Sequence, residues 1–159
     1  MNTEVKAVLG SLYEVDYQSW LEQTVAQLRA RDFGNLDLDN LIEEIESLGK
    51  RDRRAIARYL MRLCEHLLKL RYWETERAMC FRGWCVEVAN FRLQIQALLN
   101  DSPSLKNYLD EIFRAEYTNA RKLMLTASGL PANTIPQEPA WTLAQVLDED
   151  WLPWKPEVG

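Results

Sequence analysis

The sequence is poor in the residues that mark several common protein classes. Its 159 residues include six glycines and six prolines, too few for a collagen-like or low-complexity chain. Bases are in the minority, with 19 Lys and Arg against 24 Asp and Glu, and this balance argues against a protein that coats nucleic acid. No stretch approaches the 18 uninterrupted apolar residues of a membrane-spanning helix. We therefore expect neither a nucleic-acid nor a membrane partner.

Cysteine and histidine are scarce as well. The chain has three cysteines and a single histidine, His66. Its first fifteen residues lack the apolar core of a secretory signal, and an odd cysteine count in such a chain is typical of reduced thiols in a cytoplasm. Cys64 and His66 are two residues apart and so point to different sides of a helix, while one histidine cannot supply the two Glu-x-x-His motifs of a di-iron bundle. We expect no metal site and no cofactor.

Large apolar side chains, by contrast, are plentiful. Hydrophobic residues make up 47% of the chain and include six Trp, six Tyr and four Phe, which excludes intrinsic disorder. A chain of this length fits one domain. We expect a single helical domain over residues 1–159, with a core from about 12 to 130 and a C-terminal arm over 131–159.

The spacing of the apolar residues is helical along most of the chain. A first helix is predicted from residue 17 to about 29–31, where Asp16 can cap the N-terminus. A second apolar run follows Asp37, another candidate N-cap, and is in phase with a third run over residues 56–70. Gly49 lies between these two runs, and its cost of about 1 kcal/mol in a helix interior leaves open whether they form one helix or two. The second run consists of Leu38, Leu41, Ile42, Ile45 and Leu48.

Two more long helices and a different C-terminal region follow. One helix is predicted over residues 82–100, and another from Pro103 to about 127, with Ser102 as its N-cap and Gly129 ending it. Beyond residue 131 the prolines indicate an extended arm. Three tryptophans in this arm indicate that it packs against the helical bundle. Thr142 and Gln145 have the spacing of a capping box for a short helix there. The predicted fold class is all-α, a bundle of about four to five main helices with an extended arm that carries a short helix.

Several motifs follow one another in an unusual order. They include an aromatic motif, an acidic helix start, a His-Leu-Leu-Lys motif and a closing acidic motif. In this sequence they read Tyr13-Glu14-x-Asp16-Tyr17-x-x-Trp20, Asn40-Leu41-Ile42-Glu43-Glu44-Ile45-Glu46-x-Leu48-Gly49, His66-Leu67-Leu68-Lys69, Ser102-Pro103-Ser104-Leu105 and Leu147-Asp148-Glu149-Asp150-Trp151-Leu152-Pro153. Over residues 12–153 the chain resembles domain-of-unknown-function family 29, a bacterial family numerous in cyanobacteria. The resemblance implies a helical bundle and brings no activity or catalytic residues with it.

Five polar residues lie on or beside the apolar faces of the predicted helices. One interpretation is a ligand or metal pocket inside the bundle. The other, which we favour, is a buried hydrogen-bond network that fixes helix register, since buried charges need partners in either case. The predicted polar cluster consists of Glu44, Glu46, Asp52, His66 and Arg92.

Charge is sharply segregated in the middle of the sequence. Residues 37–46 carry five acids and no base, whereas residues 50–62 carry six bases and one acid. Part of the basic block forms a stripe on the outer face of the predicted helix. This stripe is either a docking surface for an acidic partner or a solvated face paired with carboxylates, such as Lys69 with Glu65, and we favour the second interpretation. The stripe consists of Arg51, Arg54, Arg58, Arg62 and Lys69.

The sequence contains no recognisable catalytic constellation beside this segregated surface. We therefore expect a non-catalytic interaction or regulatory module, with another protein or a second copy of the chain as partner. The alternative is a small-ligand or metal-dependent enzyme, in which a carboxylate and His66 share acid–base work and Arg92 holds an anionic ligand.

Overall fold

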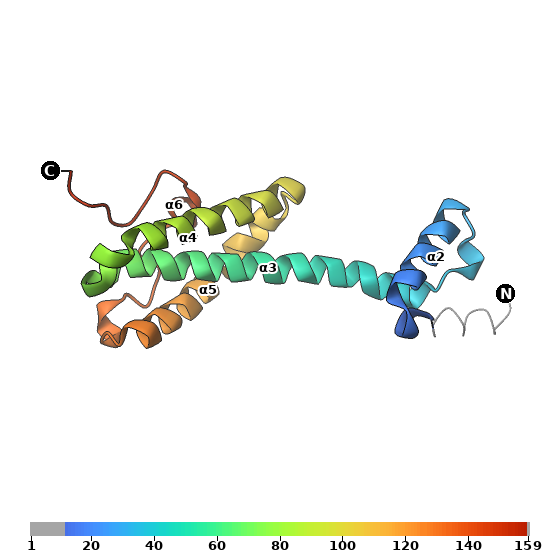
Figure 1. Cartoon of the computed structure of the whole chain (residues 1–159), viewed down its shortest axis with the longest axis horizontal. Coiled ribbons are helices and arrows are strands. Elements are labelled where there is room, and N and C mark those ends of the chain that lie inside the picture. Colours follow the sequence, from blue (N-terminus) through green and yellow to red (C-terminus); the bar gives the residue numbers. More distant parts are fainter. Residues whose placement is uncertain (1–11, 159) are drawn as a thin grey trace. The chain divides into compact units, whose positions relative to one another are not determined.

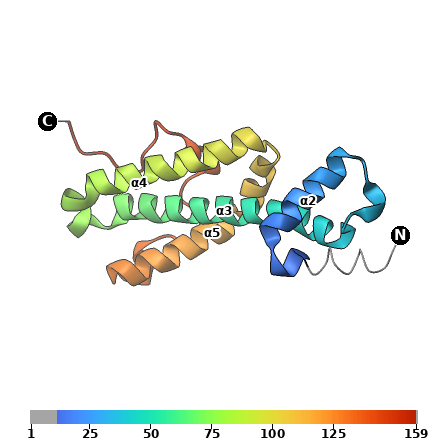
Figure 2. The same cartoon turned by 45° about the vertical axis from the view of Figure 1, so that its right-hand side comes forward.

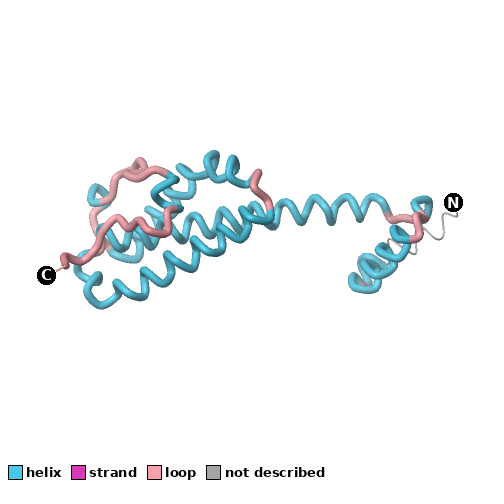
Figure 3. The backbone as a smooth tube through the Cα atoms, turned by 90° about the horizontal axis from the view of Figure 1, so that it is seen from above, coloured by secondary structure: helices cyan, strands magenta, loops and turns pink. Residues whose placement is uncertain are grey.

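The computed structural model describes residues 12–158, and helices dominate this part of the chain (Figure 1). Residues 12–15 are also helical, and the described residues contain no strand, as Figure 3 shows by its two colours for helix and loop. The predicted all-α class is therefore confirmed. The elements run in the order α2 (Tyr17–Arg29), η1 (Phe33–Asn35), α3 (Leu38–Tyr72), α4 (Glu74–Asp101), α5 (Leu105–Ser128), η2 (Ala132–Thr134) and α6 (Leu143–Leu147).

The chain divides into two compact units. The first ends at Arg51 and the second begins at Asp52. α3 contributes to both units, and it runs without interruption through Gly49. The two apolar runs that the sequence places in phase therefore belong to one helix of 35 residues.

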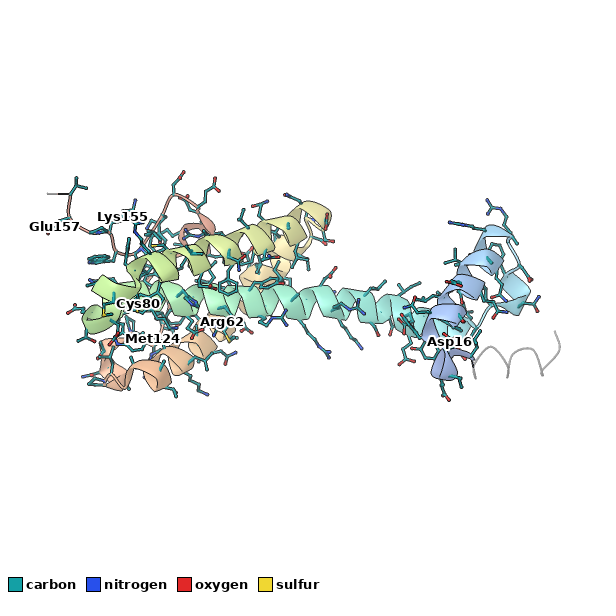
Figure 4. The ribbon with its side chains drawn as sticks, viewed as in Figure 1. Asp16, Arg62, Cys80, Met124, Lys155 and Glu157 are labelled. Carbon is teal, nitrogen blue, oxygen red and sulfur yellow. The ribbon has the colours of Figure 1, made fainter. Side chains whose placement is uncertain are left out.

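The described part of the first unit, residues 12–51, contains α2 and the first part of α3, joined by a short segment with η1. Asp16 caps α2, since its side chain accepts a hydrogen bond from the Ser19 backbone N–H (3.0 Å), and Figure 4 shows it beside this helix. Trp20 on α2 is fully buried, and its indole N–H donates to the buried Asp37 carboxylate (3.3 Å), just before α3. The predicted start of α2 is confirmed, and one buried polar contact ties the two helices together.

In the second unit, α4 and α5 lie along α3 (Figure 2). The contact faces are apolar at helical spacing, as the sequence predicts, and they bury one continuous core. Figure 4 shows Met124 of this core on α5. The fully or almost fully buried core residues include Ile56, Leu60, Leu63, Leu67, Val88, Ile95, Leu109, Tyr117 and Met124.

Two helix starts differ from the sequence prediction. α4 begins at Glu74, eight residues before the predicted start at 82, because its first two turns are largely exposed and so lack apolar periodicity; Met79, for example, is 90% exposed. The N-cap of α5 is Ser104, whereas Ser102 closes α4 by donating its backbone N–H to the Leu98 carbonyl (2.9 Å). The prediction of Ser102 as the N-cap of α5 was wrong, because the chain makes a further turn before this helix begins.

The arm after α5 folds back onto the second unit. Gly129 ends α5 with a positive φ of 68°, a conformation that glycine adopts without strain. The Tyr117 hydroxyl then donates to the Pro136 carbonyl (2.8 Å), and Arg121 donates to the Ile135 carbonyl (3.0 Å). The predicted capping box of Thr142 with its partner three residues on is present at α6. The arm is thus part of the folded body.

Candidate functional site

Arg92 holds the C-terminal arm against α4. Its side chain is 7% exposed; Nε donates to the Val146 carbonyl (2.9 Å) and Nη2 to the Trp151 carbonyl (2.8 Å). Burial lowers the pKa of this guanidinium, and the neighbouring Asp148 carboxylate opposes that shift. Two of its nitrogens are therefore committed to the backbone of the arm.

A cavity of about 800 Å³ lies beside this clamp, between α4 and the arm. Val88 and Leu147 supply part of its apolar wall, while Cys85 and Glu149 bring polar atoms to it. Burial raises the pKa of the Cys85 thiol, so the thiol form is favoured. The cavity can therefore hold a small amphipathic molecule, with Arg92 in its wall.

His66 is buried on α3, and its side chain forms no hydrogen bond with a carboxylate among those found in the described chain. Its Nδ1–H donates to the Arg62 carbonyl (2.8 Å) within the same helix, and the ring lies 5.7 Å from the Phe91 ring. Burial lowers the pKa of His66. The hydrogen bond to the Arg62 carbonyl raises this pKa, but by less than burial lowers it. The neutral imidazole is thus held in place by packing and by one backbone acceptor.

Glu44 is held inside the first unit by two tyrosines. The hydroxyls of Tyr13 and Tyr17 donate to its two carboxylate oxygens at 2.5 Å and 2.6 Å. These bonds lower the pKa of Glu44, and they raise the pKa of Tyr13 to about 12 because the bond needs the phenol proton. This carboxylate is a structural acceptor in a cluster of aromatic side chains.

The structure distributes the predicted polar cluster over separate environments. His66 and Arg92 are buried, Glu44 is half-buried, and Glu46 and Asp52 are exposed. None of the hydrogen bonds found among residues 12–158 joins two of the five. Within the same residues, no group of three His, Cys, Asp or Glu side chains is arranged to hold a metal ion.

The basic stripe is partly neutralised. Glu65 is buried between Arg62 and Lys69, and it pairs with the first at 2.6 Å and with the second at 3.5 Å. Figure 4 shows Arg62 on α3. The predicted pair of Glu65 with Lys69 is confirmed, whereas Arg51, Arg54 and Arg58 are exposed and have no ion pair within the described chain. The stripe is thus open to a partner mainly before residue 59.

The sequence does not reveal that the first apolar run of α3 is largely exposed. Among residues 12–158, nine of the fourteen exposed large apolar side chains lie in the first unit. Four of them form what we call the α3 apolar face, with exposed fractions between 46% and 60%. The periodicity correctly indicates an apolar face but not what covers it. The α3 apolar face consists of Leu38, Ile42, Ile45 and Leu48.

None of the helices in the described part of the chain is long and apolar enough to cross a membrane.

Residues 12–152 match the family model described as Domain of unknown function DUF29. The chain matches no curated protein and no solved structure. The family match covers both structural units, so the α3 apolar face and the clamped arm lie within it.

Proposed function

The chain belongs to the DUF29 family, and we propose that it works as a non-catalytic interaction module that docks a partner protein on the α3 apolar face. The observation that carries the proposal is the concentration of exposed large apolar side chains in the first unit. We place the module in the cytoplasm of a bacterium, and the free state of all three cysteines supports that location.

Burial energetics favour a covered α3 apolar face. Fully burying a leucine or isoleucine side chain is worth about 1.5–3 kcal/mol, and the four residues of this face forgo roughly half of that while they face water. Monomeric proteins rarely leave large contiguous apolar patches uncovered, and such patches mark interaction sites. A partner helix laid on this face would recover that energy.

An acidic side chain, rather than the basic stripe, borders the face. Glu46 lies about 100° around the helix from Ile45 and is exposed. Interfaces commonly combine an apolar centre with a polar rim. Arg54 and Arg58 lie on the opposite side of α3, about 180° and 140° from Ile45, and so take no part in this rim.

A second candidate function rests on the cavity beside Arg92. Its volume of about 800 Å³ suits a small molecule, and the Cys85 thiol and the Glu149 carboxylate could orient one. This candidate is the weaker one, because Arg92 already donates to two backbone carbonyls. Thermal melting with a library of small anions and metabolites tests it: a ligand that stabilises the wild type but not a Cys85→Trp variant would favour the cavity.

The interaction module is tested by charging the α3 apolar face. Ile42→Asp with Ile45→Asp would remove the docking surface, whereas Met79→Asp with Val86→Asp adds the same charge at two exposed apolar positions of α4. Each tagged full-length variant is purified gently from the organism that produces it, and the complexes are sized and their subunits identified by mass.

We expect the wild type and the Met79/Val86 control to form the same complex and the Ile42/Ile45 variant to lose it, with all three chains equally helical by circular dichroism. An identical set of complexes in the Ile42/Ile45 variant would overturn the proposal.

A further inference from the structure

The net charge of the chain belongs to the first unit. Residues 1–51 carry ten acids and five bases, whereas residues 52–159 carry fourteen of each, so the first unit accounts for the whole formal charge of −5. The unit that exposes the α3 apolar face therefore attracts cationic partners and repels anionic ones. Nucleic acids and anionic lipid surfaces belong to the second group, because their phosphates bind basic surfaces.

Acidic side chains lie at both edges of the α3 apolar face. Around α3, with Ile45 at the centre of the face, Glu46 and Asp39 lie about 100° and 120° to one side. Both are exposed and form no ion pair within the described chain. Glu44 lies about 100° to the other side, and the two tyrosine hydroxyls that donate to it lower its pKa, so it is ionised at neutral pH. Each edge therefore carries negative charge.

No base of α3 neutralises these edges within the length of the face. The segment from Leu38 to Leu48 contains neither lysine nor arginine. Lys50 and Arg51 come after the last residue of the face, and they lie about 140° and 120° around the helix from Ile45. A partner that covers the face from end to end thus meets only acids at its borders.

The shape of the face suits a single α-helix. Its four residues follow one another at intervals of three or four along α3 and span about 15 Å, which is nearly three turns. Side chains at these intervals form the ridges that pack into the grooves of a second helix. An amphipathic helix with an apolar stripe of similar length therefore matches the face.

We infer that the partner presents an amphipathic α-helix whose apolar stripe is bordered on both sides by lysine or arginine. The stripe packs on the α3 apolar face, with cations beside Asp39 and Glu46 at one edge and near Glu44 at the other. This inference rests on the proposed function, because it gives the chemistry of the partner at the same face. Its ion pairs lie at the surface, so the complex weakens as salt screens them.

Two synthetic helical peptides test the charge requirement. They share one apolar stripe and differ only in the flanking residues, which are lysine in one peptide and glutamate in the other. Fluorescence anisotropy gives the Kd of each peptide for the full-length wild type and for the Glu46→Lys and Glu43→Lys variants. Glu43→Lys is the matched control, because Glu43 is exposed and unpaired on the same helix but lies about 160° from Ile45. Sedimentation with phosphatidylglycerol vesicles tests an anionic lipid surface.

We expect the wild type to bind the lysine peptide about tenfold or more tightly than the glutamate peptide, and not to bind the vesicles. Glu46→Lys should weaken binding of the lysine peptide about fivefold, and Glu43→Lys should weaken it less than about twofold. Wild type that binds neither peptide, prefers the glutamate peptide, treats both alike or binds the vesicles would overturn the inference, as would equal losses in the two variants.

The native complex separates this inference from the proposed function. We expect Glu46→Lys to weaken the complex that the Ile42/Ile45 variant loses, and Glu43→Lys to leave it unchanged. A complex that is lost in the Ile42/Ile45 variant but equally stable in Glu46→Lys and the wild type would sink this inference alone. The proposed function fails only when charging the face changes no complex.

Discussion

Replacing Arg92 should release the C-terminal arm from the second unit. The side chain is 93% buried and joins α4 to carbonyls 54 and 59 residues further along the chain. Arg92→Met keeps much of the apolar stem but removes both donors, so the Val146 and Trp151 carbonyls lose their partners. Arg82→Met on the exposed side of α4 is the matched control, because Arg82 makes no side-chain hydrogen bond among those found.

The magnitude follows from the two bonds. A hydrogen bond to a charged group contributes about 1.5–3 kcal/mol, and the two carbonyls regain part of this by contacting water once the arm lifts. We therefore expect Arg92→Met to lower the free energy of unfolding by about 2–4 kcal/mol. For a chain of this length, that loss corresponds to a drop in Tm of roughly 5–15 °C.

Two assays check this expectation. Urea unfolding followed by circular dichroism gives the free energy, and limited proteolysis reports the arm, which should be cleaved first in the Arg92→Met variant. If Arg92→Met stays within about 0.5 kcal/mol of Arg82→Met, and its arm resists protease equally well, the two bonds do not hold the arm and our account of Arg92 is wrong.

Three further predictions concern titratable groups. In Glu44→Gln the pKa of Tyr13, now about 12, should fall toward 10 because the charged acceptor is lost, and ultraviolet difference titration against Tyr13→Phe measures this; an unchanged midpoint would contradict the bond. Burial lowers the pKa of His66 below 6.5, so the unfolded chain binds the proton more readily and stability should decline as pH falls below about 6.5. Urea midpoints across that range should lose part of this decline in His66→Gln, and identical profiles would refute it. Burial raises the pKa of the Cys64 thiol to about 12, so iodoacetamide at neutral pH should alkylate it only after denaturation, and rapid labelling of the native chain would contradict its burial.

The parts of the fold that depend on neighbouring residues could be predicted from the sequence. Asp16 caps α2 and Thr142 caps α6 because each bonds a backbone N–H three residues away, which is a local geometry. Gly129 ends α5 for an equally local reason. The alternatives that Gly49 left open are resolved as one continuous helix, and a propensity difference of about 1 kcal/mol was too small to choose between them beforehand.

The candidate site was less predictable, because periodicity identifies a face but not its neighbour. Arg92 was correctly placed inward, yet its acceptors are backbone carbonyls of a distant arm, which no side-chain pattern encodes. Glu44 was predicted as a member of the polar cluster with His66 and Arg92, but the hydroxyls of two tyrosines donate to both of its carboxylate oxygens. The α3 apolar face looked like core from its spacing alone, and only the fold shows that it is exposed.

Thiol labelling on α3 tests the docking of a partner most directly. In a Cys80→Ser and Cys85→Ser background, Ile45→Cys places a thiol in the α3 apolar face, whereas Val86→Cys places one at an exposed apolar position of α4. We predict that iodoacetamide alkylates both thiols equally fast in the isolated chain, and that only the Ile45→Cys thiol is protected in the gently purified complex. Equally fast labelling of both thiols in the complex would contradict the account.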